Sequence, residues 1–265
     1  MSGLYDVVAL GELLIDFTYG GRSAAGMRLF EQNPGGAPAN VLCLLANMGK
    51  KTALIGKVGR DMHGDFLRET LMAKHIGVSG LMQDDSVFTT LAFVELAGGE
   101  RKFSFARKPG ADTRLTSAEL DRTLLKNTKI FHFGSLSLTA EPSRTATLDA
   151  LGAARDAGAV ISYDPNYRAP LWDDSETAAR RMRSVLGRVD MIKLSAEETA
   201  LLTGSDEPDT AAGRLLDMGV QCAVVTLGKS GALVRVKGGA ARAAAAPCAV
   251  VDTTGAGDAF WGGFL

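Results

Sequence analysis

Strand-like and helix-like patterns alternate along most of the chain. Short apolar runs predict buried strands at 5–10, 52–58, 129–133, 159–163, 189–194 and 222–227. Between them, apolar residues recur at helical spacing and predict helices at 39–48, 61–77, 116–126, 144–157, 176–187, 196–202 and 209–218. This alternation is typical of an α/β fold in which helices cover a mainly parallel sheet.

Two stretches, 13–30 and 88–105, interrupt this rhythm. They look like paired β segments without a helix between them, and the second contains a Gly-Gly turn at 98–99. We therefore expect a small β lid, formed by residues 12–33 and 87–106, that covers a binding site. The alternative is an exposed hairpin that only packs on the sheet or on another subunit.

Composition narrows the class of protein. The 265 residues carry a formal net charge of −1 and contain no block of Lys and Arg, which argues against nucleic acid or an anionic membrane as the main partner. Cys43, Cys222 and Cys248 have no C-x-x-C spacing, so a disulfide framework or a zinc site is not expected. No secretory signal or membrane-spanning run is visible, and we expect a cytoplasmic protein of one domain.

A glycine-rich turn, Gly255-Ala256-Gly257, leads into a helix that begins near Asp258. Consecutive small residues at a helix N-terminus allow backbone N–H groups to converge on an anion such as a phosphoryl group. Asp258 would face the same point and could accept a proton from a hydroxyl nucleophile. A dinucleotide fingerprint does not fit because Phe260 occupies its last glycine position, and a turn into a packed helix remains the plain alternative.

A second glycine turn, "GGAPAN", also enters a helix. Gly35 and Gly36 offer backbone N–H groups, and Asn40 offers an amide, to a ligand with several hydroxyl groups. Asp16, in "GELLID", could accept hydrogen bonds from two neighbouring hydroxyls. Each feature also has a purely structural explanation, as a turn or a helix start.

Polar residues follow two further strands. Asp164, Asn166 and Arg168 leave one strand at its carboxyl end, where open α/β sheets bind ligands. Glu198 lies three residues after Ser195, a spacing that fits either a helix capping box or a carboxylate that holds hydrated Mg²⁺.

The two longest motifs together resemble the signatures of one family. "GGAPANVLCLLANMGKKTALIGKVGRDMHG" and "DTTGAGDAFWGGFL" are similar to the paired signatures of the PfkB carbohydrate kinases, and the likeness covers essentially the whole chain. The resemblance implies a ribokinase-like three-layer fold. "GELLIDF", "GGAPAN" and "DPNYRAPLW" are most similar to bacterial fructokinases within it.

The resemblance also implies roles for individual residues. Asp258 matches the catalytic base, and Gly255, Ala256 and Gly257 match the anion hole. The positions implied to bind substrate are Asp16, Gly35, Gly36, Asn40, Phe105, Arg107 and Arg168. Those implied to bind ATP are Asp164, Asn166, Lys193, Ser195, Thr226, Leu227, Gly228, Lys229, Gly231 and Gly257. Glu198 is implied to hold Mg²⁺ indirectly, and Asp252 and Thr254 a monovalent cation such as K⁺.

The resemblance predicts an ATP-dependent sugar kinase that converts D-fructose to fructose 6-phosphate. Phosphorylation of 2-keto-3-deoxygluconate is the first alternative, and homodimerisation through the lid is a further expectation. Two departures from the family pattern stand out: Ser195 replaces the Asn of an N-x-x-E motif, and the C-terminal part of the family fold is absent after Leu265. A second alternative is therefore a protein that binds sugar but binds ATP weakly and turns over poorly.

Overall fold

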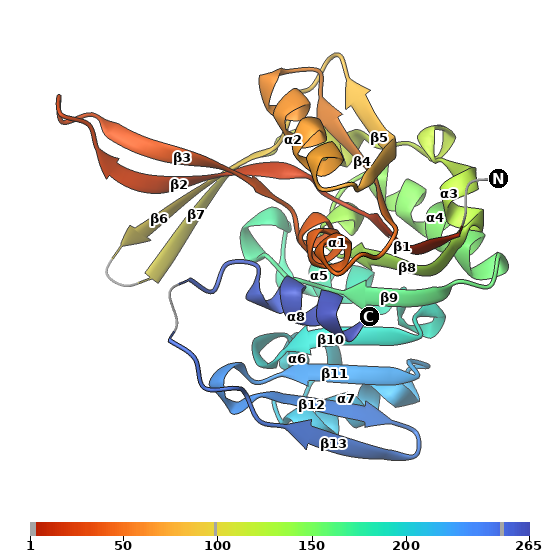
Figure 1. Cartoon of the computed structure of the whole chain (residues 1–265). Coiled ribbons are helices and arrows are strands. Elements are labelled where there is room, and N and C mark those ends of the chain that lie inside the picture. The colour runs from red at the N-terminus through yellow and green to blue at the C-terminus, as the bar shows by residue number, and fades with distance from the viewer. Residues whose placement is uncertain (1–3, 98–99, 250–251) are drawn as a thin grey trace.

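The computed structural model describes residues 4–97, 100–249 and 252–265. Within these residues, nine strands form one large sheet in the order β13-β12-β11-β10-β9-β8-β1-β4-β5 (Figure 1). They are β1 Tyr5–Leu10, β4 Thr52–Gly59, β5 Gly77–Asp84, β8 Thr128–Gly134, β9 Val160–Asp164, β10 Met191–Ser195, β11 Cys222–Thr226, β12 Ala232–Val236 and β13 Gly239–Ala243. Within this sheet, all neighbouring strands between the β5 edge and β11 pair in parallel. At the other edge, β12 pairs antiparallel with β11, and β13 pairs antiparallel with β12.

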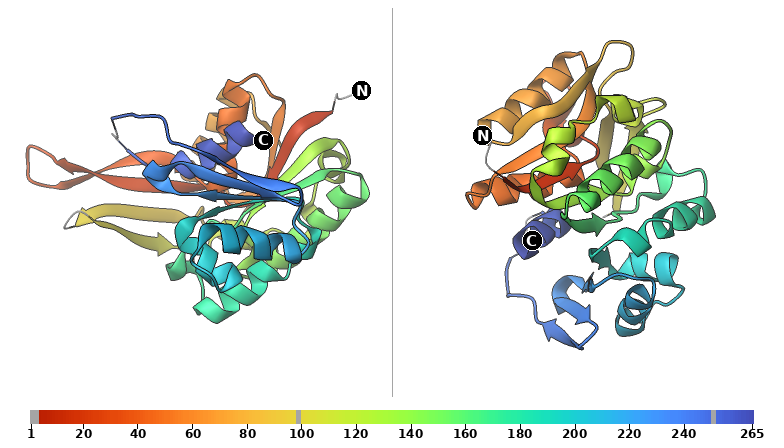
Figure 2. Two further views of the ribbon diagram at one scale, coloured as in Figure 1. Left: turned by 90° about the horizontal axis from the view of Figure 1, so that it is seen from below. Right: turned by 90° about the vertical axis from the view of Figure 1, so that its right-hand side faces the viewer.

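Helices cover both faces of this sheet (Figures 1 and 2). They are α1 Ala37–Asn47, α2 Met62–Ala73, α3 Arg122–Lys126, α4 Ser143–Asp156, α5 Ser175–Arg183, α6 Ala196–Thr203, α7 Pro208–Asp217 and α8 Ala256–Phe264. Successive residues of β1 point to opposite faces. Val7 therefore packs in the core under α1, α2 and α8, and Val8 packs in the core under α3 to α7.

A second sheet extends from the body of the molecule (Figures 1 and 2). Its strands, in the order β3-β2-β6-β7, are β2 Leu14–Arg22, β3 Arg28–Gly35, β6 Leu91–Ala97 and β7 Glu100–Ala106. β2 pairs antiparallel with β3 and parallel with β6, and β6 pairs antiparallel with β7. These strands lie in the two stretches for which the sequence predicts a lid; the turn expected at 98–99 lies outside the described residues.

The predicted α/β class with a mainly parallel sheet is confirmed, as is a smaller second sheet. Three boundaries were wrong. Residues 116–126 do not form one helix: a 3₁₀ turn, Ser117–Glu119, is followed by α3, because Asp121 caps α3 through the N–H groups of Thr123 and Leu124.

The expected helix 176–187 ends at Arg183, and a separate 3₁₀ turn forms at Leu186–Arg188. The helix expected at 61–77 ends at Ala73, and Gly77 is instead the first residue of β5. The pattern also missed β12 and the Ala-rich edge strand β13, whose residues are exposed and carry no buried-strand signal.

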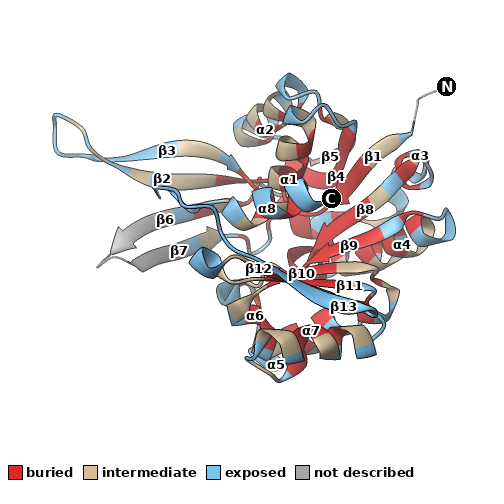
Figure 3. Cartoon of the chain, turned by 60° about the horizontal axis from the view of Figure 1, so that its bottom comes forward, coloured by how far each residue is buried: buried red, intermediate tan, exposed pale blue. Residues whose placement is uncertain are grey.

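Burial follows this architecture: the central strands of the large sheet are buried, whereas its edge strand β13 and much of β3 in the second sheet are exposed (Figure 3). Among the described residues, no helix has the length and apolar character needed to traverse a lipid bilayer.

Candidate active site

A cleft of about 520 Å³ lies between the second sheet, the N-terminus of α1 and the N-terminus of α8. Residues far apart in the sequence line it: Glu12, Leu14, Asp16, Thr18, Tyr19, Gly36, Ala37, Asn40, Val94, Phe105, Leu136, Asn166, Arg168, Asp252, Thr253, Thr254, Gly255 and Asp258. The two glycine turns that the sequence singles out thus open onto one cavity. It has the size and the mixed polar lining of a small-molecule site.

Asp258 lies in the first turn of α8, where it is 8% exposed. Its Oδ2 accepts a 2.9 Å hydrogen bond from the Asn40 side-chain amide, and its Oδ1 accepts one of 3.2 Å from the Asn166 amide. Both oxygens are therefore oriented by residues from other elements. A carboxylate held at a cleft wall in this way can accept a proton from a ligand hydroxyl.

The first turn of α8, which contains Asp258, offers backbone N–H groups to a ligand. Gly255 adopts the left-handed conformation, with φ 69°, and turns the chain into the helix. The N–H groups of Gly257 and Asp258 have no acceptor within the helix because they belong to its first turn. Together with the helix dipole, they form a positive end that suits an anion.

The turn before α1 depends on its two glycines. Gly36 has φ 117°, and a Cβ there would lie 2.3 Å from the Glu12 carbonyl oxygen. A Cβ on Gly35 would lie 2.2 Å from Oδ2 of Asp16. The chain therefore requires glycine at both positions to bring the turn and the Asp16 carboxylate together in the cleft wall.

Asp16 projects from β2 into the cleft. Burial raises its pKa to about 6, and the nearby carboxylate of Asp258 contributes in the same direction, while Arg168 opposes both. Near neutral pH the Asp16 carboxylate is ionised and can accept hydrogen bonds from ligand hydroxyls.

Two buried ionisable groups lie beneath α8. Lys193 donates a 2.7 Å hydrogen bond to Asp164, and both side chains are nearly inaccessible to solvent. Burial lowers the pKa of Lys193, but the Asp164 carboxylate outweighs it, and the pKa is raised overall. A Cβ on Gly257 would lie 3.0 Å from Nζ of Lys193, so this ammonium group lies directly under the glycine turn.

Glu198 joins two loops at the same edge of the sheet. Its two carboxylate oxygens accept backbone hydrogen bonds from Tyr167, at 2.6 Å, and Ser195, at 2.8 Å. The capping interaction expected for Ser195 and Glu198 is therefore present. Because both oxygens are occupied, this side chain fits a contact to Mg²⁺ through bound water better than direct coordination. Among the described residues, no group of three or more His, Cys, Asp or Glu side chains could hold a metal ion.

Of the predicted nucleotide residues, Asn166 lines the cleft and Gly257 lies in α8, whereas most of the others lie along neighbouring strand ends. Ser195 and Thr226 are partners in register at the carboxyl ends of β10 and β11. The loop after Thr226 is closed by a 2.8 Å hydrogen bond from the Leu227 N–H to the Gly231 carbonyl. The predicted loop residues Thr226, Leu227, Gly228, Lys229 and Gly231 do not line the cleft.

The predicted cation residues Asp252 and Thr254 lie at the rim. The hydroxyl and the N–H of Thr254 each donate a 2.8 Å hydrogen bond to Oδ1 of Asp252. Both residues line the cleft beside Gly255.

The two predicted substrate arginines lie in different surroundings. Arg168 is exposed and lines the cleft. Arg107 does not line it: its guanidinium group is buried and bonded to Asp112, Thr139 and the Leu136 carbonyl. Phe105, two residues earlier, does reach the cleft.

Glu12 is a lining residue that the sequence reasoning missed. It is 4% exposed, and Oε1 accepts a 3.0 Å hydrogen bond from the N–H of Ala37. The signal for it was an acidic residue within the apolar run before Asp16. Asn166 is also closer to the chemistry than expected, because it contacts Asp258.

Comparison with known proteins gives consistent matches along the chain. The sequence profile of the pfkB family carbohydrate kinases matches residues 5–265. The chain is 43% identical over 265 residues to a probable fructokinase-7 of Arabidopsis thaliana, covering 98% of this chain and 77% of the relative.

Two solved structures are similar over nearly the whole fold. A fructokinase from Xylella fastidiosa with bound ATP superposes with a TM-score of 0.90 at 32% identity, covering 98% of this chain and 80% of the other. A double mutant of a fructokinase from Vibrio cholerae, in a form with fructose, ADP and potassium ion bound, has a TM-score of 0.87 at 30% identity, covering 99% and 83%.

Proposed function

The chain belongs to the pfkB family of carbohydrate kinases and is an ATP-dependent sugar kinase, and we propose that its substrate is D-fructose, phosphorylated at O6. The observation that carries the proposal is the position of Asp258. It lies at the N-terminus of α8, bonded to Asn40 of the other glycine turn, inside a cleft that suits a small polar ligand. The fructokinase relatives named above support fructose among the sugars.

Asp258 is the general base of the proposed reaction. Its carboxylate takes the proton of the primary hydroxyl as that oxygen attacks the γ-phosphorus of ATP, and the bond from the γ-phosphorus to the bridging oxygen of ADP breaks. The amides of Asn40 and Asn166 hold both carboxylate oxygens in place, so little reorganisation is needed as the proton moves.

The first turn of α8 stabilises the charge that develops on the transferred phosphoryl group. The N–H groups of Gly257 and Asp258 lie at the positive end of the helix. Lys193, held by Asp164 beneath the turn, adds a positive charge at short range. Mg²⁺, when bound with the nucleotide, supplies further neutralisation of phosphate charge, and Glu198 would reach it through water.

The sugar lies between the second sheet and the turn before α1. Asp16 and Asn40 form hydrogen bonds with its hydroxyl groups, and Phe105 of β7 packs against it; all three residues line the cleft. ATP lies over the ends of β9, β10 and β11, with the loop at 226–231 beside the nucleotide. Asp252 and Thr254 would hold a monovalent cation, which would add positive charge at the edge of the cleft.

We also propose that the second sheet acts as a lid and as a dimer contact. Phe17 stacks on Phe93, and Phe30 packs edge-on against Phe93, on the face opposite Asp16. Phe30 and Phe93 are 37% and 38% exposed, so this aromatic face has apolar area available for a second copy of the chain. Light scattering after size exclusion tests the assembly: a monomer at all concentrations would contradict it.

The direct test of the function is an ADP-release assay with fructose, 2-keto-3-deoxygluconate, ribose and adenosine. We expect the highest kcat/KM with fructose, and phosphorus NMR of the product should show a 6-phosphate ester. A higher kcat/KM with 2-keto-3-deoxygluconate would assign the carboxylated sugar instead, with Arg168 as its partner. If calorimetry detects sugar binding but no ADP is released, the alternative of a sugar-binding protein with poor turnover is favoured.

A further inference from the structure

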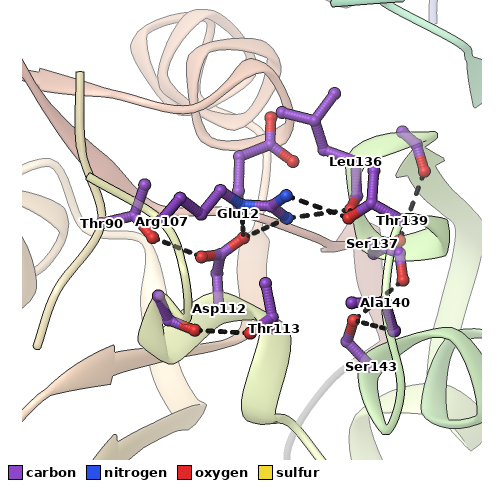
Figure 4. Close-up of polar contacts among 12 residues, drawn as sticks. Glu12, Thr90, Arg107, Asp112, Thr113, Leu136, Ser137, Thr139, Ala140 and Ser143 are labelled. Carbon is purple, nitrogen blue, oxygen red and sulfur yellow. Dashed lines mark hydrogen bonds and ion pairs between the residues drawn. The ribbon is translucent and has the colours of Figure 1, made fainter. Parts of the chain in front are cut away.

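Glu12 lies where the large sheet meets the second sheet. It follows β1 by two residues and precedes β2 by two, and its side chain lines the cleft together with Asp16 and Leu136. Figure 4 shows its carboxyl group beside Arg107 and Leu136. The position puts a carboxyl group on the cleft floor, between the turn before α1 and the base of the second sheet.

The two oxygens of this carboxyl group differ. Oε1 accepts a hydrogen bond from the Ala37 N–H, which is one of the first-turn donors of α1 without an acceptor in its helix. Oε2 is fully buried and has no hydrogen-bond partner among the described residues. A buried polar atom without a partner is costly, and one at the wall of a polar cleft is relieved by a ligand that donates to it.

The surrounding charges do not supply that partner. The two charged side chains that act on the pKa of Glu12 are Arg107 and Asp112, which are bonded to each other at 2.6 Å. The remaining donors of Arg107 go to Thr139 and to the Leu136 carbonyl (Figure 4). Arg107 therefore already has acceptors for its guanidinium group, and the second oxygen of Glu12 is left without a partner among the described residues, in a side chain that lines the cleft.

A purely structural role for Glu12 accounts for only half of this arrangement. Capping the Ala37 N–H needs one acceptor, which an uncharged glutamine would supply without placing a charge in the interior. The chain nevertheless has a carboxyl group at this position, although burial disfavours the ionised form of that group and raises its pKa. A hydroxyl group of the substrate that donates a hydrogen bond to Oε2 would account for the second oxygen.

We propose that Glu12 is a further substrate-binding residue, whose Oε2 accepts a hydrogen bond from a sugar hydroxyl other than the one that is phosphorylated. Oε1 at the same time holds the turn that carries Asn40. The carboxyl group thereby couples the position of the sugar to the position of the turn that orients Asp258. This inference rests on the proposed sugar-kinase function and assigns an additional contact within its sugar site.

The test compares wild type with Glu12→Gln, and with Glu69→Gln on the exposed face of α2 as a matched control. Glutamine retains an acceptor for the Ala37 N–H and replaces the second oxygen with a donor. We expect the Kd for fructose, measured by calorimetry, to rise about tenfold or more. The KM for ATP should stay near its wild-type value, the variant should not melt at a lower temperature than wild type near neutral pH, and Glu69→Gln should change none of these quantities. An unchanged fructose Kd in folded Glu12→Gln would overturn the proposal.

A panel of deoxy sugars tests the contact itself and remains informative if Glu12→Gln folds poorly. Fructose analogues lacking the 1-, 3- or 4-hydroxyl are titrated into wild type, Glu12→Gln and Glu12→Asp, which keeps the charge but withdraws it by one methylene. For one analogue, the variants should lose no further affinity, because its missing hydroxyl is the partner of Glu12. Equal additional losses with every analogue would show that Glu12 acts only through the fold.

These experiments distinguish a wrong role for Glu12 from a wrong choice of substrate. If wild type does not bind fructose but binds another sugar of the assay panel, the choice of fructose fails. The same comparison with deoxy forms of that sugar then decides the role of Glu12.

Discussion

The Asn40 side chain donates a 2.9 Å hydrogen bond to Asp258 across 218 positions of sequence. Asn40 lies in the first turn of α1, after one glycine turn, and Asp258 lies in the first turn of α8, after the other. The two helices pack side by side (Figure 1), and a Cβ on Gly262 of α8 would lie 3.0 Å from the Val41 carbonyl of α1. The two glycine turns are therefore one structural unit, in which the position of the turn before α1 sets the orientation of the Asp258 carboxylate.

Asp258→Asn should reduce kcat by at least about 10²-fold, because the amide cannot accept the hydroxyl proton. The Kd for fructose should change far less, since the hydroxyl contacts of Asp16 and Asn40 remain. Single-turnover ADP release and calorimetry measure the two quantities. Asp149→Asn, an exposed carboxylate on α4, is the control and should behave as wild type. Turnover near the wild-type rate in Asp258→Asn would remove Asp258 from the role of base.

Substitution of Arg107 should reduce stability, whereas substitution of Arg168 should reduce catalysis. Arg107→Ala leaves the buried Asp112 carboxylate without its ion pair, and we expect a loss of about 3–5 kcal/mol in unfolding free energy. Arg168→Ala, at an exposed position on the cleft, should reduce kcat/KM while the urea midpoint stays unchanged. Arg122→Ala on the surface of α3 is the control for both. A stable Arg107→Ala with a raised KM for sugar alone would instead place Arg107 at the substrate, as the sequence resemblance predicts.

Much of the fold could be predicted because its signals are local. Buried parallel strands produce continuous apolar runs, and helix starts such as Asp61 carry a capping side chain whose partners are two and three residues away. The break between Ser117–Glu119 and α3 was not predictable from periodicity, because Asp121 offers a second helix start within an apolar pattern that suits one continuous helix. Exposed edge strands such as β13 carry no burial pattern at all.

Candidate site residues could be predicted from the sequence one by one, but the contacts between them depend on the tertiary fold. The glycine turns and their polar residues are visible in the sequence, whereas the bond between Asn40 and Asp258 exists only because α1 and α8 meet. Glu12 could not be predicted because the Ala37 N–H that bonds its side chain is 25 positions away, and because the burial of Glu12 cannot be inferred from neighbouring residues. Arg107 and Asp112 are only five positions apart, but the burial of their ion pair depends on the distant 3₁₀ turn at Leu136–Leu138, where the Leu136 carbonyl and the Thr139 hydroxyl accept further hydrogen bonds from Arg107.

Gly36→Ala should destabilise the chain and weaken sugar binding. The new Cβ would meet the Glu12 carbonyl at 2.3 Å, and φ 117° is unfavourable for any residue with a side chain. We expect a loss of more than about 1 kcal/mol in unfolding free energy and a raised KM for fructose. Gly152→Ala is the matched control, because a Cβ there meets no heavy atom within 4 Å in the middle of α4. That variant should be neutral or more stable by up to about 1 kcal/mol. Equal effects at both sites would mean that the turn before α1 tolerates a side chain.

Ser162→Ala should destabilise the attachment of α8 to the sheet. Ser162 accepts a 2.9 Å hydrogen bond from the Trp261 indole and lies 2.9 Å from Nδ1 of His132. Burial lowers the pKa of His132 to about 3, so its ring is neutral and can accept the serine proton. The alanine variant leaves two buried polar groups unpaired, and we expect a loss of about 2–4 kcal/mol in urea unfolding. Ser175→Ala, at the exposed start of α5, should cost far less. An equally small effect at Ser162 would show that packing alone holds α8.

The last prediction concerns the pH dependence of stability. Burial raises the pKa of Glu12 to about 7, while Asp112 raises it further and Arg107 and the Ala37 N–H oppose the rise. Because the folded pKa lies above the unfolded one, this group favours folding fully below about pH 4.5, and that contribution is lost as the pH rises through about 7. The shift corresponds to about 3 kcal/mol at about 1.4 kcal/mol per pKa unit. Glu12→Gln cannot ionise, so its unfolding free energy relative to wild type should rise by up to that amount between about pH 4.5 and pH 8.

Urea unfolding of both proteins across this pH range measures the difference. Asp16, whose pKa is also raised, to about 6, titrates in both proteins, and its contribution therefore cancels when one curve is subtracted from the other. Glu69→Gln, whose side chain is exposed on α2, should differ from wild type by a constant across the range. Fructose at saturating concentration should reduce the pH-dependent difference, because a hydroxyl bonded to Oε2 favours the ionised carboxylate. A flat difference between Glu12→Gln and wild type without sugar would mean that Glu12 titrates at its ordinary pKa, and that the fold already solvates its second oxygen.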